Sequence, residues 1–178
     1  RHGTHCLSAS GSIGHDSSMT RSSSYCRPLA RTSRAGYHAD MAKQCGTFEH
    51  TADLGLSARA DSLGELLEAL GEGLAAVICP PEQVQPAQVR TVEARSEDAE
   101  ALAVDFLVEV MNAVQADRFM VHHVSARAGE WHVRAELHGE PYDADRHAID
   151  REVKAVTYHA LRIERVAEQW EGEVILDL

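Results

Sequence analysis

The sequence predicts an α+β fold, a two-layer sandwich in which two main helices pack against a mostly antiparallel sheet. Two kinds of hydrophobic periodicity support this prediction. Two segments repeat apolar residues at helical spacing, and several others alternate apolar and polar residues, as half-buried strands do. The alternating segments come largely in neighbouring pairs with short connections, which is typical of antiparallel hairpins.

The first predicted strand covers residues 54–60 and ends before Ser62. Ser62 and Glu65 have the spacing of a capping box, so a helix should begin here. Pro80 should end this helix, because proline cannot continue the helical hydrogen bonding. One face of the helix carries an apolar stripe made of Leu63, Leu66, Leu67, Leu70, Leu74, Val77 and Ile78.

A second strand is predicted over residues 89–94, and a second helix should follow it. Ser96 is the expected N-cap, with Glu97 and Asp98 favourable at the positive end of the helix dipole. The buried face of this helix should consist of Leu102, Phe106, Leu107, Val110, Met111 and Val114.

The C-terminal third predicts two hairpins separated by a loop. Residues 119–127 and 131–138 alternate at period two and should form the first hairpin. A loop follows over residues 141–150. Periodicity leaves residues 154–161 open between a short helix and a strand, and the closing hairpin is predicted over residues 162–166 and 170–176.

Residues 1–40 differ in composition from the rest of the chain. They contain nine Ser, five Arg, four His and only two acidic residues. Such a segment cannot bury enough apolar surface to order itself, so residues 1–45 are expected to be a disordered extension of a domain over residues 46–178. We expect Met41 to be the physiological start, although an organelle-targeting segment would have a similar composition.

Net charge points to the kind of partner. Because residues 1–40 hold five Arg against two Asp, the other 138 residues hold 12 Lys and Arg against 26 Asp and Glu, a net charge of −14. An acidic domain is repelled by nucleic acid and by anionic membranes, so neither is an expected direct partner. A basic protein is the expected partner, because its charge is opposite to that of this domain.

Cysteine usage and hydropathy indicate a cytoplasmic protein. The four Cys show no CxxC spacing, which argues against a zinc site or a disulfide framework. No apolar run approaches the roughly 18–20 residues that cross a bilayer. The G-x-G-x-x-A pattern over residues 71–76 falls inside a predicted helix rather than in a strand-to-helix turn, so packing explains it better than nucleotide binding.

Two acidic residues and the chain end are candidate metal ligands. Asp53 directly precedes a predicted strand, and Asp177 precedes the terminal Leu178. Two carboxylates and a terminal oxygen suit a hard cation such as Ca²⁺ or Mg²⁺ if folding brings them together. Taken alone, each Asp would more often be a turn or strand-end residue.

Four motifs resemble those of the archease family in the same order: HTADLG from His50, GEPYD from Gly139 with His147, EVKAVTYH from Glu152, and the closing VILDL. The resemblance runs from about Phe48 to Leu178. It implies a divalent-metal site, with Ca²⁺ as the expected ion, formed by Asp53, Asp177 and Leu178. It also implies a functional Lys154 able to meet a phosphate or a partner carboxylate, although that lysine could equally be a snorkelling surface residue. His50 is expected to orient the Asp53 loop.

The resemblance implies a function without catalysis. Archeases assist the tRNA-splicing ligase that joins RNA 3′-phosphate or 2′,3′-cyclic phosphate ends to 5′-hydroxyl ends, promoting its guanylylation and multiple turnover. No GxSxG, P-loop or Cys–His signature is present, so the sequence offers no convincing nucleophile. The alternatives are a metal-dependent hydrolase or phosphotransferase, and a chaperone or modulator of RNA-modifying enzymes.

Overall fold

The computed structural model describes residues 43–50 and 53–178. Within these ranges the chain forms two α-helices, one short 3-10 helix and seven strands, in the order β1 (Gln44–His50), β2 (Asp53–Ala60), α1 (Leu63–Ile78), η1 (Pro81–Gln83), β3 (Gln88–Arg95), α2 (Ala99–Gln115), β4 (Phe119–Ala128), β5 (His132–Pro141), β6 (Ala155–Val166) and β7 (Gln169–Asp177). The prediction of an α+β fold with two main helices and antiparallel strands is confirmed. The strands form two sheets, however, and not the single sheet of the predicted two-layer sandwich.

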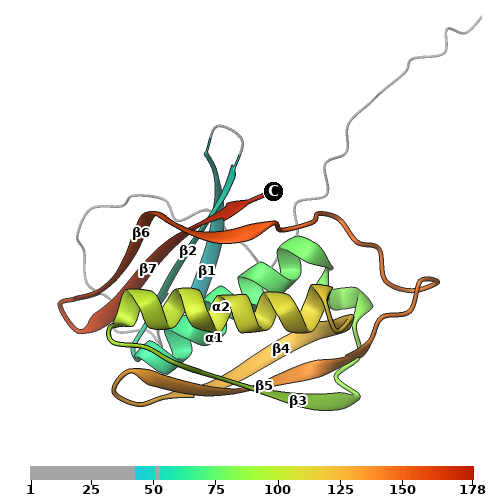
Figure 1. The fold of residues 1–178 in the computed structure, drawn as a ribbon, viewed down its shortest axis with the longest axis horizontal. Helices are drawn as coiled ribbons and strands as arrows, with labels where there is room; N and C mark the ends of the chain where they lie inside the picture. The colour runs from blue at the N-terminus through green and yellow to red at the C-terminus, as the bar shows by residue number, and fades with distance from the viewer. Residues whose placement is uncertain (1–42, 51–52) are drawn as a thin grey trace, which may run out of the picture.

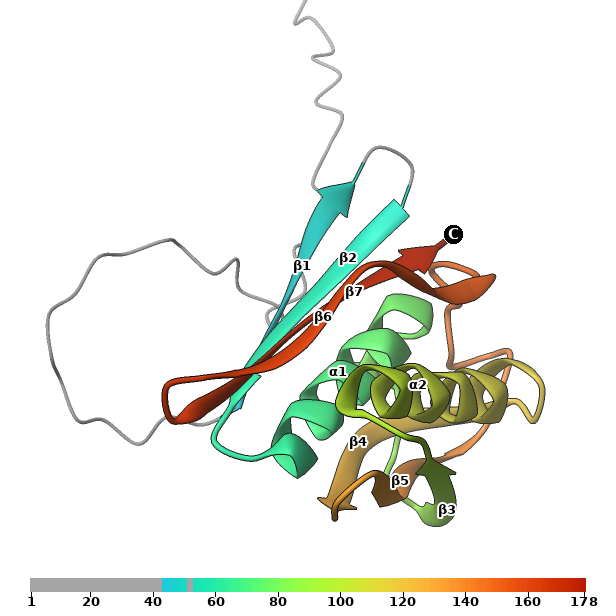
Figure 2. The same ribbon diagram turned by 60° about the vertical axis from the view of Figure 1, so that its left-hand side comes forward.

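The strands divide into two antiparallel sheets with the helices between them (Figures 1 and 2). One sheet has four strands in the order β1-β2-β7-β6, and the other has three in the order β3-β5-β4. Both helices contact strands of both sheets. Each helix can therefore bury apolar side chains on two sides, which a surface helix cannot do.

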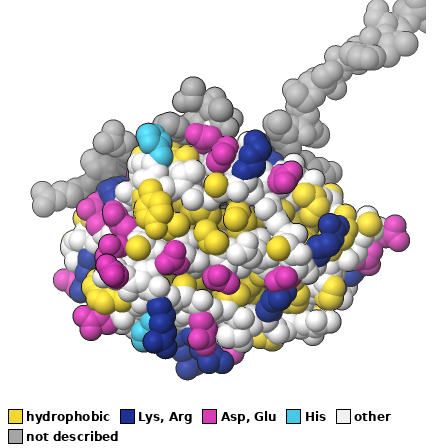
Figure 3. Space-filling view, viewed as in Figure 1, with side chains coloured by type: hydrophobic (Ala, Val, Ile, Leu, Met, Phe, Trp, Pro, Cys, Tyr) yellow, Lys and Arg dark blue, Asp and Glu magenta, His cyan; other side chains and the backbone are white. Residues whose placement is uncertain are grey.

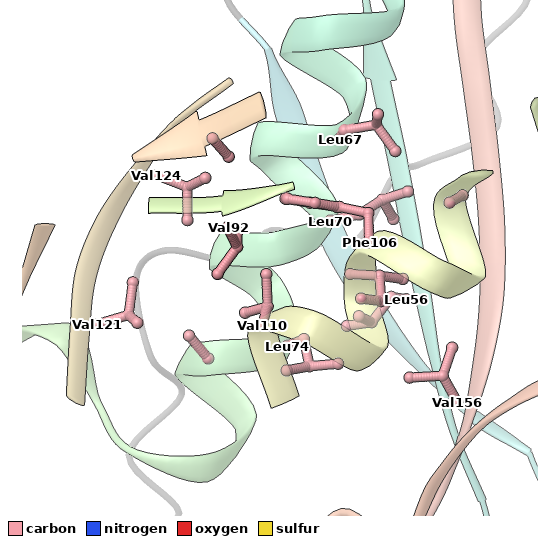
Figure 4. Close-up of a cluster of buried hydrophobic side chains, with 14 of the residues drawn as sticks. Leu56, Leu67, Leu70, Leu74, Val92, Phe106, Val110, Val121, Val124 and Val156 are labelled. Carbon is pink, nitrogen blue, oxygen red and sulfur yellow. The ribbon is translucent and has the colours of Figure 1, made fainter. Parts of the chain in front are cut away.

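The core fills the space between the sheets and centres on the two helices (Figure 4). Phe106 from α2 and Leu70 and Leu74 from α1 are fully buried there. Val124 from the three-stranded sheet and Leu56 from the four-stranded sheet enter the same cluster from opposite sides. One continuous core thus joins both sheets and fixes the relative positions of their strand ends.

Helix α1 begins as the sequence predicts. The Ser62 hydroxyl accepts a hydrogen bond from the Glu65 N–H at 3.2 Å, and the Glu65 carboxylate accepts one from the Ser62 N–H at 3.0 Å. Gly71 lies inside this helix, where an added Cβ would come within 3.2 Å of the Phe106 ring. Close packing, not nucleotide binding, therefore explains the first glycine of the G-x-G-x-x-A pattern.

The N-cap of α2 is Asp98, so the prediction of Ser96 was wrong. The Asp98 carboxylate accepts a hydrogen bond from the Ala101 N–H at 2.8 Å. The Ser96 hydroxyl instead hydrogen-bonds the Asp105 carboxylate. Aspartate is as good an N-cap as serine, and a short irregular stretch before the helix shifts its start by two residues.

Strand β1 was not predicted from the sequence, because its residues alternate only weakly. It pairs with β2, and Phe48 lies directly opposite Gly55 in the register. The Phe48 ring covers this glycine so closely that an added Cβ would lie 2.1 Å from it. A cross-strand contact, not a local pattern, thus stabilises the strand.

Residues 154–161, which the sequence left open between helix and strand, belong mostly to strand β6. The pairing of β6 with β7 is irregular between Thr157 and Arg162. Ala160 within this irregularity has a φ of 51°, in the left-handed region. An inserted bulge shifts the alternation of side chains, which is why period-two analysis did not identify the strand.

The predicted extension over residues 1–45 and the start at Met41 fall almost wholly on residues outside the described ranges. Lys43, Gln44 and Cys45 are the exception, and Gln44 and Cys45 are the first residues of β1. Neither described helix combines the length and apolar character needed to cross a membrane.

Candidate functional site at one end of the four-stranded sheet

The structure brings the predicted metal ligands to the same end of adjacent strands. Asp53 is the first residue of β2, and Asp177 is the last residue of β7. These strands are antiparallel neighbours, and Leu54 pairs with Leu176. Asp53 and Asp177 each lie one residue beyond that pair, so both carboxylates belong to one sheet end. The C-terminus lies beside the start of β2 in both ribbon views (Figures 1 and 2).

Lys154 joins the same sheet end from the residue before β6. Its main-chain N–H donates to the Asp177 carbonyl oxygen at 2.8 Å. Its ammonium group donates to the main-chain oxygen of Leu178 at 2.5 Å. Lys154 is exposed, while Asp53, Asp177 and Leu178 are partly exposed. A cation and two carboxylates are therefore accessible together at this end of the sheet.

Gln115, at the end of α2, holds the segment that leads into Lys154. The Gln115 side-chain amide donates to the Val153 carbonyl oxygen at 2.8 Å, and its own oxygen accepts from the Val153 N–H at 2.9 Å. Val153 is fully buried. Because unpaired main-chain groups are costly in the interior, this two-point contact fixes the residue that precedes Lys154.

Two further features concern the predicted site. The side chain of His50 lies outside the described residues, so its proposed role in orienting the Asp53 loop stays a prediction. Among residues 43–50 and 53–178, no group of three or more His, Cys, Asp or Glu side chains is arranged to hold a metal ion. The predicted set has only two such side chains and a main-chain oxygen, so this finding does not bear on it.

Glu140, in the GEPYD motif, is buried. Only 7% of it is exposed. Its carboxylate accepts two hydrogen bonds from the Arg146 guanidinium, at 2.8 and 2.9 Å, and one from the Gln85 N–H at 2.7 Å. His147 Nε2 lies 3.1 Å from the same group. These donors compensate for the loss of water around a buried charge.

The same donors determine the protonation of Glu140. The bonds from Arg146, followed by the bond from the Gln85 N–H, lower the pKa of Glu140 to about 2, although burial acts in the opposite direction. His147 also accepts from the Asp143 N–H at 2.9 Å through Nδ1. The GEPYD motif with its histidine is thus a structural clamp on the β5–β6 connection, which ends at Lys154.

A cavity of about 210 Å³ lies beside this connection, where it passes the C-terminal ends of α1 and α2. It is lined by Ile78, Val114, Gln115, Arg118, Met120, Tyr142, Ile149 and Glu152. No sequence pattern indicates this cavity, because its lining comes from four separate segments.

Three histidines cluster on the three-stranded sheet. The His123 and His138 rings are stacked with centroids 4.1 Å apart, and His122 Nδ1 lies 3.2 Å from His123 Nδ1. Burial, followed by the neighbouring His138 and His122, lowers the pKa of His123. Stacked rings do not converge their nitrogens on one point, as ligands of a single metal ion do.

Comparisons with known proteins place the fold and the motifs in one family. The sequence profile of the Archease protein family (MTH1598/TM1083) matches residues 46–178. The chain is 35% identical to protein archease of Pyrococcus abyssi over 136 residues, which are 74% of this chain and 96% of that protein. It is 36% identical to protein archease of Methanopyrus kandleri with the same coverage.

Comparison with solved structures points to the same family as the sequence matches. The solution structure of Methanobacterium thermoautotrophicum protein 1598 matches with a TM-score of 0.64 and 27% identity, covering 77% of this chain and 99% of that one. The crystal structure of a Thermotoga maritima protein described as an archease and possible chaperone matches with a TM-score of 0.54, covering 80% of this chain and all of that one. Its 17% identity supports the fold alone. With a family profile matching about three quarters of its length and relatives above 30% identity, the chain belongs to the archease family.

Proposed function

We propose that this protein is a non-enzymatic activator of the tRNA-splicing RNA ligase, acting through the end of the four-stranded sheet that carries Asp53, Asp177 and Lys154. The observation that carries the proposal is the meeting of these residues, which lie far apart in the sequence, at one accessible sheet end. Family membership supports it, because these positions lie in the motifs of the archease resemblance. The ligase reaction itself would stay with the ligase.

The donor set fits a divalent metal such as Ca²⁺. Asp53 and Asp177 would supply hard carboxylate oxygens and Leu178 a main-chain oxygen, the ligand types that Ca²⁺ prefers. When bound, the metal would supply a concentrated positive charge able to attract phosphate or carboxylate groups of the partner. Because the Lys154 ammonium already contacts the Leu178 oxygen, lysine and metal would compete for that oxygen.

Charge supports a protein partner rather than direct RNA binding. Residues 41–178 carry a net charge of −14. On the face shown in Figure 3, acidic side chains are scattered over the surface rather than gathered in one patch. An RNA-binding ligase needs a basic surface, and an acidic domain can associate with it rapidly through complementary charge. We therefore propose that the protein acts beside the ligase without direct contact with nucleic acid or membrane. The proposed location of both proteins is the cytoplasm.

A reconstituted ligation assay tests the proposal. Purified tRNA-splicing ligase would be given GTP, a divalent metal and RNA with 3′-phosphate and 5′-hydroxyl ends, with and without this protein. We expect the wild-type protein to raise the number of turnovers per ligase. Asp53→Asn and Asp177→Asn should abolish the increase, whereas Asp145→Asn, an exposed change in the β5–β6 connection, should not.

The same assay separates the alternatives. Turnover of RNA or phosphate esters by this protein without the ligase would indicate the metal-dependent hydrolase or phosphotransferase. Absence of stimulation by a folded wild-type protein would reject the activator role. Stimulation that persists fully in both Asp variants would keep the activator role but remove the proposed metal site from it.

A further inference from the structure

The cavity beside the β5–β6 connection has the size and lining of an anchor site for one side chain. At about 210 Å³ it is smaller than the roughly 300–1,000 Å³ of pockets that hold drug-sized ligands. Its floor is apolar, with Ile78 from α1, Val114 from α2 and Met120 from β4. Ile149 at its lip is 46% exposed, which is unusual for an isoleucine in a well-packed domain.

Arg118 adds a positively charged, planar group to the lining of this cavity. Its guanidinium carbon lies 4.2 Å from the centre of the Tyr142 ring, and Tyr142 donates its main-chain N–H to the Arg118 carbonyl oxygen at 2.7 Å. Arg118 has a φ of 53°, a conformation that costs free energy in a residue other than glycine. In the described part of the chain it forms no ion pair with a carboxylate, although the domain is rich in them.

A planar cation of this kind attracts an aromatic ring, and an apolar floor accommodates one. Glu152, exposed in the cavity lining, can accept a hydrogen bond from a phenol O–H or an indole N–H. The strong negative charge of the domain favours a basic segment around that ring. We propose that this cavity receives one tyrosine or tryptophan side chain from a basic segment of a protein partner.

This inference rests on the proposed function for the identity of the partner, which would be the RNA ligase. Gln115 lines the cavity and also holds Val153, the residue before Lys154. Glu152 lines the cavity two residues before Lys154. An aromatic anchor bound here would therefore fix the orientation in which Lys154 and Asp177 meet the ligase. Buried aromatic anchors commonly carry most of the binding free energy of an interface.

A titration without the ligase tests the cavity directly. The probes are 4-methylphenol and 3-methylindole, which stand for the tyrosine and tryptophan side chains, added to the full chain while its methyl NMR signals are followed. We expect saturable shifts of the Ile149 and Met120 methyl signals. Arg118→Gln should weaken probe binding at least threefold, whereas Arg127→Gln, at an exposed arginine on β4, should leave it unchanged. Absence of saturable shifts with both probes in the wild type would overturn the proposal.

A second measurement uses the ligase. Arg118→Gln and Ile149→Ala should each weaken the affinity for the ligase about tenfold, because each removes part of a buried anchor contact. Both lie at exposed positions, so folding should be retained. If the wild type stimulates the ligase while both variants bind it as tightly as the wild type, the anchor cavity is refuted and the activator role stands. If the wild type neither binds nor stimulates the ligase, the activator role fails and the probe titration alone decides whether the cavity accepts an aromatic ring.

Discussion

Lys154 contacts Leu178 through its ammonium group and Asp177 through its main-chain N–H, so one residue touches both members of the C-terminal pair. The main-chain bond lies just before the first residue of β6 and holds the backbone in place. The side-chain bond is different, because it puts a positive charge on an oxygen that a metal would use. If Leu178 binds a metal as proposed, lysine and metal compete for this oxygen, which leads to the first prediction.

Replacing Lys154 with methionine should tighten Ca²⁺ binding. Removing one positive charge a few ångströms from the metal position is worth about 1 kcal/mol in a solvent-exposed site, or roughly a fivefold lower Kd. Isothermal titration of the metal-free protein with Ca²⁺ measures this change. Arg127→Met, a loss of the same charge on the other sheet, is the control and should have little effect.

Stimulation of the ligase by Lys154→Met should fall even though the metal binds more tightly, because the lysine is proposed to contact the partner. Weaker or unchanged Ca²⁺ binding in this variant would contradict the competition. Full stimulation would show that Lys154 is only a surface residue whose ammonium reaches the nearest oxygen.

Gln115→Leu should destabilise the protein by roughly 2–3 kcal/mol, because it leaves the buried N–H and carbonyl of Val153 without partners. Chemical unfolding measures the loss, and hydrogen exchange should show a less protected Val153 amide. Asn112→Leu, on an exposed position of the same helix, should change stability by less than about 0.5 kcal/mol.

Gln115→Glu separates the two hydrogen bonds of this contact. A carboxylate can still accept from the Val153 N–H, but it cannot donate to the Val153 carbonyl and repels it. This variant should therefore be destabilised as well. A Gln115→Glu protein as stable as the wild type would mean that the donated bond contributes nothing.

How much the sequence could predict depended on whether the signal was local. The Ser62–Glu65 capping box lies within one helical turn, so it was read correctly. The start of α2 was missed by two residues because Ser96 and Asp98 are both good caps. Strand β1 was missed because it depends on pairing with β2, which no local pattern records.

The candidate site likewise depends on contacts between residues that are distant in the sequence. Its proposed metal ligands were favoured only through the archease resemblance, since Asp53 and Asp177 taken alone look like ordinary strand-end residues. That β2 and β7 are neighbours follows from the sheet order, which hydrophobic periodicity does not determine. Gln115 carried no signal at all, because its partner Val153 lies in a distant connection and the contact is made with main-chain atoms.

Gly139→Ala should be severely destabilising, by more than about 3 kcal/mol. An added Cβ would lie 1.8 Å from the Met120 carbonyl oxygen, where strand β4 bulges against β5. A main-chain atom held in a sheet cannot move aside as a side chain can, so the strands would have to separate. Loss of soluble expression or a strongly lowered Tm would show this effect.

Gly129→Ala is the matched control for that substitution. The three atoms nearest to its added Cβ all belong to the ring of His132, an exposed side chain that can rotate away. Its cost should be below about 1 kcal/mol. Equal tolerance of alanine at Gly139 and Gly129 would mean that the β4–β5 approach is looser than the structure indicates.

Glu140→Gln should lower stability at neutral pH and flatten its acid dependence. The pKa of Glu140 is lowered to about 2 in the folded protein, against an ordinary value near 4.5. A carboxylate with a depressed folded-state pKa stabilises the protein above its unfolded-state pKa, and this contribution is lost as the pH falls from about 4.5 to 2. The glutamine variant has no charge to lose in that window, while the Arg146 guanidinium loses its strongest acceptor.

The measurement is urea unfolding of both proteins at several pH values between 7 and 2.5. At pH 7 the variant should be less stable by roughly 2–3 kcal/mol, the scale of hydrogen bonds to a charged group. The gap should narrow steadily below pH 4.5. Glu136→Gln, on the same strand but more than half exposed, should run parallel to the wild type throughout. A gap that stays constant down to pH 2.5 would show that the charge of Glu140 does not hold the connection leading to Lys154.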